Sequence, residues 1–252
     1  MRIIHALLLS LLFFFILIEF AYALPSGFVY LHQVDMGILQ DIRYAGLHNF
    51  IGRPVKGYEA HECILTKQAA QALSLVQKEL QKSSLSLKVY DCYRPTMAVA
   101  DFIVWSHDSA HQEMKPEFYP RVNKADVFNL GYVAEKSGHS RGSTIDLTIV
   151  PYPAPNQASY RRGQHLISCI APYHQRYQDN SIDMGTGFDC MDALSHGTNR
   201  TINKLAYEHR MFLRQLMINN GFEPYAYEWW HFTLKDEPYP TTYFNFKVEK
   251  GI

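Results

Sequence analysis

The chain contains the segment SGHSRGSTIDLTIV at residues 137–150. Its second half is rich in β-branched residues and roughly alternates, which predicts a strand entered from a glycine-bounded turn. His139 then lies in the turn and Asp146 lies within the strand. An aspartate in a buried strand is unfavourable unless a cation or several hydrogen-bond donors satisfy it. Asp146 is therefore either a metal ligand or a hydrogen-bonded structural residue.

A second segment, YEWWH at residues 227–231, adds Glu228 and His231. Two histidines and one carboxylate form a set of three zinc ligands that leaves a fourth position open for water. A further carboxylate that does not touch the metal is needed to carry protons, and Glu228 suits that task. The spacing is not that of the helical H-E-x-x-H zinc peptidases, which excludes that class. These residues therefore form the set that a zinc hydrolase needs, with His139, Asp146 and His231 as candidate ligands of one zinc ion and Glu228 as the candidate general base and acid.

The remaining pattern predicts an α+β fold, in which helices pack on a mostly antiparallel sheet with the metal site across one face. Apolar periodicity and capping residues indicate three helices, and β-rich runs indicate three strands. The helices are expected over residues 66–83, 95–105 and 203–220, and the strands over 85–90, 144–150 and 225–234. Glu228 and His231 would face opposite sides of a regular strand, so the last strand must contain a bend or a bulge.

The first residues describe a targeting signal rather than part of the fold. Arg2 precedes an apolar run over residues 6–18, and the sequence Ala-Tyr-Ala at 21–23 has the small-x-small form of a signal peptidase site. We therefore expect a signal peptide over residues 1–23 and a single domain over 24–252, which is exported to the periplasm or secreted. An uncleaved N-terminal anchor is the alternative.

The four cysteines are most simply two disulfides if the chain is exported to an oxidising compartment. Cys63 lies at the start of a predicted helix that should pack beside the strand carrying Cys92, which favours that pair. Cys169 would then bond to Cys190 and tie the long segment 151–182 back to the domain. Zinc binding by cysteine is the competing interpretation, but the chain has no C-x-x-C pair.

Charge and length restrict the class of partner. The chain has 24 Lys and Arg against 24 Asp and Glu, so its formal net charge is zero. Without a long basic run we expect no nucleic-acid binding, and no stable membrane association once the signal is removed. The part of the chain after residue 23 suits one domain with a sizeable core.

Five motifs in order carry a resemblance to a known family. S-x-H-x-x-G-x-x-x-D and E-x-W-H are joined by three further landmarks, which are Asp91-Cys-Tyr-Arg94-Pro, Met184-Gly-Thr-Gly-Phe-Asp189, and Arg43-Tyr44-Ala followed by Asn49-Phe50. Together they span residues from about 40 to 232. On these motifs the chain resembles the zinc D-alanyl-D-alanine dipeptidases of the VanX type, within the wider D,D-peptidase and Hedgehog-like group.

The resemblance implies that His139, Asp146 and His231 bind zinc and that Glu228 is the general base and acid, and it implies roles for further residues. Arg94 would stabilise the oxyanion of the tetrahedral intermediate, and Asp189 would hold the free ammonium group of the substrate. Ser137, Asp91 and Tyr44 would line a small pocket. Each role has an ordinary competitor, because Arg94 could brace a helix start and Asp189 could be a turn residue.

The resemblance implies a zinc dipeptidase that hydrolyses D-Ala-D-Ala or a close D,D-dipeptide to free amino acids. The first alternative is a D,D-carboxypeptidase that trims murein peptides, which would need space where Asp189 otherwise meets a free amine. The second is a non-catalytic zinc protein that binds envelope material, and the presence of Glu228 and Arg94 argues against it. Export suits scavenging or cell-wall turnover.

Overall fold

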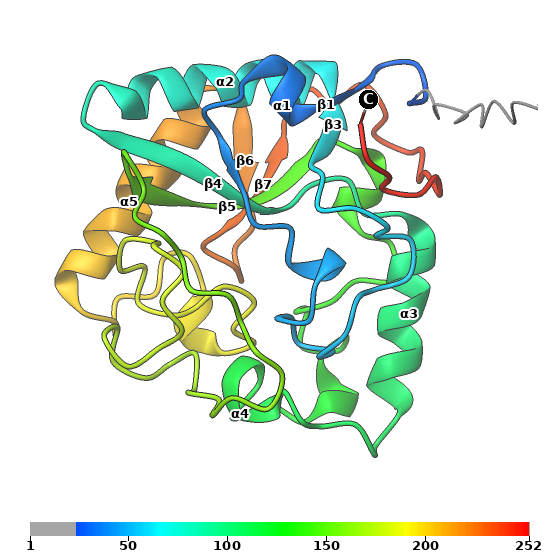
Figure 1. Cartoon of the computed structure of the whole chain (residues 1–252), viewed down its shortest axis with the longest axis vertical. Helices are drawn as coiled ribbons and strands as arrows, with labels where there is room; N and C mark the ends of the chain where they lie inside the picture. Colours follow the sequence, from blue (N-terminus) through cyan, green and yellow to red (C-terminus); the bar gives the residue numbers. More distant parts are fainter. Residues whose placement is uncertain (1–23, 252) are drawn as a thin grey trace, which may run out of the picture.

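The computed structural model describes residues 24–251 of the chain, so the predicted signal peptide at 1–23 lies outside the described residues. The described part has the predicted α+β fold (Figure 1). Its strands are β1 (Phe28–Tyr30), β2 (Leu39–Gln40), β3 (Ile64–Thr66), β4 (Leu85–Asp91), β5 (Thr144–Pro151), β6 (Phe222–Pro224) and β7 (His231–Leu234). Its α-helices are α1 (Leu31–Val34), α2 (Lys67–Gln81), α3 (Thr96–His107), α4 (Lys115–Phe118) and α5 (Lys204–Asn219). Short 3-10 helices are η1 (Arg43–Ala45), η2 (Lys124–Asp126), η3 (Gly138–Arg141) and η4 (Ala193–Ser195).

The central sheet is mixed and has the strand order β2-β4-β5-β7-β6. The edge strand β2 pairs with β4 in parallel, and the other three pairings are antiparallel. A separate antiparallel pair is formed by β1 and β3. The single strand expected over residues 225–234 is wrong in its first part, because β6 ends at Pro224 and β7 begins at His231. The intervening residues form the bend that the positions of Glu228 and His231 required.

Two long helices cover one side of the sheet. α2 packs against β4, and α5 packs against β6 and α2 (Figure 1). Thr66 begins α2 because its side chain accepts a hydrogen bond from the backbone N–H of Ala69, and Asn203 caps α5 in the same way. Both helices lie where the sequence predicts them. The buried face of α5 is formed by residues such as Leu213 and Met217, whereas Leu205 and Phe212 are exposed.

A bulge in β4 changes the side of the sheet that the following residues face. Val89 pairs with Leu147, but the register then shifts so that Asp91, two residues later, pairs with Asp146. Adjacent residues on β5 face opposite sides of the sheet, so Val89 and Asp91 also face opposite sides, although a regular strand would put them on the same side. The extra residue in the bulge is Tyr90. As a result, β4 contributes Val89 to one face and Asp91 to the face that carries Asp146.

Residues 152–192 cross this second face without forming a helix or strand. In Figure 1 they form the yellow-green coil between α4 and α5. Buried charges hold the coil on the sheet, since Arg43 donates to both Asp41 and Asp179 at 2.9 Å. Lys88 of β4 also lies within ion-pair distance of these two carboxylates. Asp41 and Asp179 therefore offset the burial of both cations, and Asp179 fastens the coil to η1 and β4.

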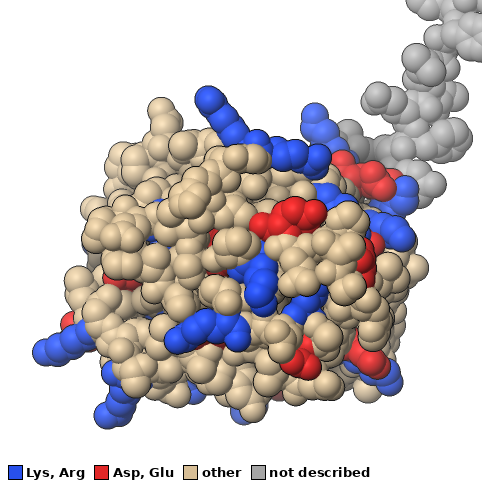
Figure 2. Space-filling model, turned by 90° about the horizontal axis from the view of Figure 1, so that it is seen from below, with Lys and Arg blue, Asp and Glu red and all other residues tan. Residues whose placement is uncertain are grey.

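The four cysteines form the predicted disulfides, Cys63–Cys92 and Cys169–Cys190. Within residues 24–251, no helix is both long and apolar enough to cross a membrane. Figure 2 shows one face of the molecule, on which basic and acidic side chains are interspersed among uncharged atoms. That face has no extended patch of one charge sign, in keeping with the balanced composition.

Candidate active site

Three side chains meet on the sheet face that carries Asp146, and we call His139, Asp146 and His231 the triad. Asp146 on β5 pairs in register with His231 at the start of β7. His139 reaches them from η3, where the Ser137 side chain accepts a hydrogen bond from the backbone N–H of His139. Gly142 ends this turn at a φ of 84°, and a Cβ there would collide with the ring of Phe28. The tight turn between His139 and β5 therefore depends on glycine.

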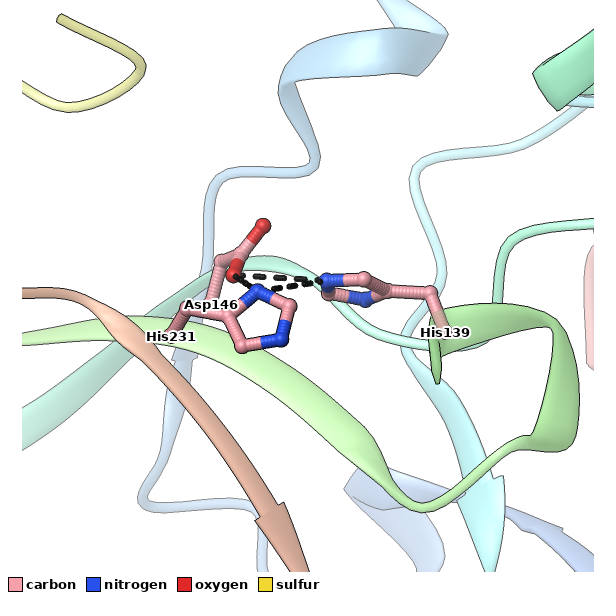
Figure 3. Close-up of side chains that lie close together, drawn as sticks. All are labelled: His139, Asp146 and His231. Carbon is pink, nitrogen blue, oxygen red and sulfur yellow. Dashed lines mark hydrogen bonds and ion pairs between the residues drawn. The ribbon is translucent and has the colours of Figure 1, made fainter. Parts of the chain in front are cut away.

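The donor atoms of the triad converge on one point (Figure 3). His139 Nε2 lies 3.3 Å from Asp146 Oδ1 and 3.3 Å from His231 Nδ1, and His231 Nδ1 lies 3.1 Å from Asp146 Oδ1. Ligand atoms bonded to a tetrahedral ion at about 2.0–2.1 Å are roughly 3.3 Å apart. Asp146 Oδ1 is buried and has no well-oriented hydrogen bond among the described residues. The three residues therefore fit one tetrahedral metal ion with a free fourth position.

A backbone carbonyl fixes the ring of His139. The N–H at Nδ1 of His139 donates to the carbonyl oxygen of Cys92 at 2.7 Å. Because the proton is held on Nδ1, the lone pair of Nε2 is free for a metal. Asp91 Oδ2 lies 3.4 Å from the same Nδ1 and adds negative charge behind the ring.

Glu228 lies beside the triad without belonging to it. Its Oε2 is 3.3 Å from His231 Nδ1, and its side chain is largely buried. Burial alone would lower the pKa of His231, but the adjacent carboxylates of Asp146 and Glu228 outweigh it and raise that pKa to about 9. The two imidazoles in turn hold the pKa of Asp146 below its usual range, against the effect of burial. The centre is therefore an anionic environment that attracts a cation.

Arg94 follows β4 and is held rigidly at the edge of the centre. Its Nε and Nη2 lie 2.9 and 2.8 Å from Asp91 Oδ2, and Nη2 is 3.7 Å from Asp146 Oδ2. The guanidinium also lies over the rings of Tyr44 and Phe102. Asp91 is fully buried and is not among the residues that line the cavity, whereas Arg94 is. The structure thus places Asp91 behind Arg94 rather than at the pocket wall.

Asp189 and Tyr44 form a second polar group, which we call the acidic subsite. The hydroxyl of Tyr44 donates to Asp189 Oδ2 at 2.8 Å. Burial, followed by the charge of Asp146, raises the pKa of Asp189 well above its usual value, and the Tyr44 hydrogen bond offsets only part of this. A buried carboxylate of this kind is strongly stabilised by a cationic partner.

One cavity of about 270 Å³ joins the triad to the acidic subsite. Its walls include Glu228, Arg94, Ser137 and Tyr44, so of the predicted polar site residues only Asp91 is absent. Other side chains of the cavity wall were not singled out from the sequence, among them Lys136, Tyr132 and Tyr225. Lys136 directly precedes Ser137, so its position beside the motif was the available signal. A separate cavity of about 540 Å³ around Trp105 contains none of the predicted site residues.

An α+β sheet that presents two imidazoles, one carboxylate ligand and one free carboxylate to a single cavity is typical of single-metal hydrolases. Comparison with known proteins gives the family. The family model described as D-ala-D-ala dipeptidase, Peptidase M15, matches residues 25–152 and 152–249. The chain belongs to this metallopeptidase family.

Relatives from three bacteria support the assignment. The chain is 38% identical to a D-alanyl-D-alanine dipeptidase of Enterococcus faecalis over 89% of its own length and 100% of that protein. It is 37% identical to a D-alanyl-D-alanine dipeptidase of Streptomyces coelicolor, with the same coverage. The identity to a D-alanyl-D-alanine dipeptidase of Escherichia coli is 30%, over 77% of each chain. The match therefore extends over the whole fold and not only over the motifs.

Proposed function

We propose that this protein is a zinc dipeptidase that hydrolyses D-Ala-D-Ala or a close D,D-dipeptide. The observation that carries the proposal is the acidic subsite, which shares one small cavity with the triad. A free dipeptide is short and has an ammonium group next to its only peptide bond. Asp189 would bind that ammonium group while the peptide carbonyl lies at the triad.

The triad would hold the zinc ion through His139 Nε2, Asp146 Oδ1 and His231 Nδ1. Polarisation of the scissile carbonyl and a lowered pKa of the attacking water are the chemistry that zinc supplies when bound. Glu228 accepts the proton of that water and delivers it to the departing amine nitrogen. Glu228 Oε2 lies 3.3 Å from His231 Nδ1, which is close enough to the triad for both proton transfers.

Arg94 stabilises the negative charge that develops on the carbonyl oxygen. Asp91 occupies Nε and Nη2 of the guanidinium, which fixes its plane and leaves Nη1 for the substrate. A donor held in place before the reaction stabilises the transition state without reorganisation. Asp91 is then a positioning residue for Arg94 and His139.

Lys136 is proposed to bind the free carboxylate of the dipeptide. Three basic side chains other than the imidazoles line the cavity. Arg94 is paired with Asp91, and Arg141 is paired with Glu237 at 2.8 Å. Lys136 is exposed and makes no ion pair with any described residue. It is therefore the cation of the cavity wall that remains available to a second substrate charge.

We further propose that residues 1–23 are a cleaved signal peptide and that 24–252 form one domain acting in the periplasm or outside the cell. The two buried disulfides support export, because such bonds persist in oxidising compartments. The mixed sheet with its triad supports placing the fold in the Hedgehog-like group. Fractionation of cells and N-terminal sequencing of the mature protein would test export, and active protein found only in the cytosol would reject it.

A substrate panel tests the proposed function. Purified protein should hydrolyse D-Ala-D-Ala, should lose activity with a chelator and should regain it with zinc. L-Ala-L-Ala and N-acetyl-D-Ala-D-Ala should be poor substrates, the latter because acetylation leaves the buried Asp189 without its cation. A murein pentapeptide cleaved as fast as the free dipeptide would reject the dipeptidase in favour of a D,D-carboxypeptidase.

A further inference from the structure

Each disulfide lies next to a residue of the proposed active site. Cys92 directly follows Asp91 and precedes Arg94 by two residues, and Cys190 directly follows Asp189. We propose that the two disulfides position the two sides of the site separately. Cys63–Cys92 would hold the metal side, and Cys169–Cys190 would hold the acidic subsite. This inference rests on the proposed function for its kinetic part only.

On the metal side, the disulfide fixes the carbonyl that orients His139. That carbonyl belongs to Cys92 and accepts the Nδ1 proton of His139 at 2.7 Å. The bonded partner, Cys63, is itself immobilised, since its N–H donates to Gln40 Oε1 at 2.7 Å and its carbonyl accepts from Leu31 at 2.9 Å. Both cysteines are buried. The disulfide therefore anchors Cys92 to a fixed part of the fold. The hydrogen bond from His139 to the Cys92 carbonyl extends this anchoring to a proposed metal ligand.

On the other side, the disulfide stabilises an unusual backbone conformation. Asp189 has a φ of 56°, in the left-handed region that non-glycine residues rarely adopt. The chain is tethered on both sides of it, because the Gly187 N–H donates to Cys169 at 2.9 Å and the Met191 N–H donates to Phe118 at 2.8 Å. The Cys169–Cys190 bond closes this arrangement. Without it, the backbone at Asp189 could relax and move the carboxylate away from its partner Tyr44.

The two tethers act on different steps. A tether behind His139 influences how firmly the metal is held, since the partner of a ligating histidine typically changes metal affinity by about ten- to a hundredfold. A tether at Asp189 influences substrate binding and leaves the triad untouched. If a disulfide only stapled the fold, its removal would lower the melting temperature. It would leave the rate constants and metal retention of folded molecules unchanged.

The experiment compares Cys63→Ala/Cys92→Ala with Cys169→Ala/Cys190→Ala at a temperature well below both melting transitions. Three quantities are measured: zinc release to a competing chelator, kcat, and KM for D-Ala-D-Ala. The first variant should release zinc at least about tenfold faster and lose kcat, with KM within about twofold of wild type. The second should retain zinc and kcat, with KM raised roughly tenfold. Wild-type constants and zinc release in both variants, with only a lower melting temperature, would overturn the proposal.

A second measurement covers variants that fail to fold. Zinc-loaded wild-type protein is titrated with a phosphine reductant, new thiols are alkylated, and peptide mapping assigns each broken bond. Zinc release should follow opening of Cys63–Cys92 and not of Cys169–Cys190, and release that follows the second bond would overturn the proposal. Zinc release requires no substrate. If wild-type protein does not cleave D-Ala-D-Ala, the proposed function fails while the metal arm still gives its own answer.

Discussion

The two sides of the cavity are built in different ways. The metal side rests on the sheet, where strand register puts Asp91, Asp146 and His231 side by side across β4, β5 and β7. The acidic subsite rests on irregular chain, where Asp189 occupies a left-handed conformation and contacts Tyr44 of η1. Backbone pairing in the sheet fixes the spacing between residues of the metal side, whereas the acidic subsite lies on irregular chain that can change without moving the sheet. We therefore expect substitutions on the two sides to fall into separate kinetic classes.

The largest effect should come from removing a metal ligand. His231→Ala deletes one of three converging donor atoms, so the purified variant should lose its zinc and hydrolysis should fall to background. The loss of metal affinity should exceed the roughly hundredfold effect of altering a ligand's partner. Metal analysis measures the zinc content, and the dipeptide assay measures the rate of hydrolysis. The control is His165→Ala, at an exposed histidine outside the cavity. Wild-type activity in a metal-free variant would contradict the role of the sheet side.

Glu228→Gln should separate chemistry from metal binding on the same side. The amide cannot accept the proton of the attacking water, so kcat should fall by about 10²- to 10⁴-fold while zinc content stays at one ion per chain. Glu223→Gln on the exposed edge of β6 is the matched control and should keep full activity. Retention of a near-normal kcat would mean that another group moves the proton.

Asp189→Asn tests the opposite side of the cavity. Loss of a charge-assisted hydrogen bond to the substrate ammonium should lower kcat/KM for D-Ala-D-Ala by about ten- to a hundredfold without changing zinc content. Discrimination against the N-acetylated dipeptide should shrink by a similar factor. Asp236→Asn, at an exposed carboxylate, should have no effect. If Asp189→Asn lost zinc, the two sides would not be independent.

Zinc affinity should depend on pH through His231. Its pKa is raised to about 9, so below that pH the metal-free protein carries a proton that zinc must displace. Affinity should therefore rise by about tenfold per pH unit as the pH increases toward 9, and then level off. Competition with a chelator of known pH dependence measures the zinc affinity. An affinity that does not change between pH 7 and pH 9 would contradict the prediction.

The smallest effect is expected at the rim. Lys136→Ala removes an exposed cation, and exposed ion pairs contribute about 0.2–1 kcal/mol, so KM should rise by no more than about fivefold. The change should diminish at high salt because solvent screens exposed charges. Lys235→Ala provides an exposed lysine control. An unchanged KM at low salt would assign the substrate carboxylate to another residue.

The same division decided what could be predicted from the sequence. His139, Asp146, Glu228 and His231 sit on short local motifs, and the order of these motifs along the chain, which resembles that of a known family, was what grouped them. The helix starts at Thr66 and Asn203 were readable because capping is local.

The rest depended on tertiary contacts that leave no local pattern. Residues 225–230 have strong β propensity, yet they form a bend, which is held by backbone hydrogen bonds from Tyr225 to His231 and from Gly197 to Ala226. Asp91 was expected in the pocket wall, but the bulge and its bonds to Arg94 place it behind that wall. Lys136 was not identified, since an exposed lysine beside a motif looks like any surface lysine.

The bulge at Tyr90 makes β4 a strand with two phases. Before the bulge, Leu87 and Val89 face the core and Lys88 faces the other side; after it the alternation is reversed, so Asp91 faces the side of the cavity. Deleting one residue at the bulge would leave Leu87 and Val89 in place but would turn Asp91 toward the core. Arg94 would then lose the carboxylate that holds it. Conversely, Leu87 and Val89 can be replaced by residues of similar volume without changing the direction in which Asp91 points. The one inserted residue thus allows the core residues of β4 to change without altering the position of the residue that serves the cavity.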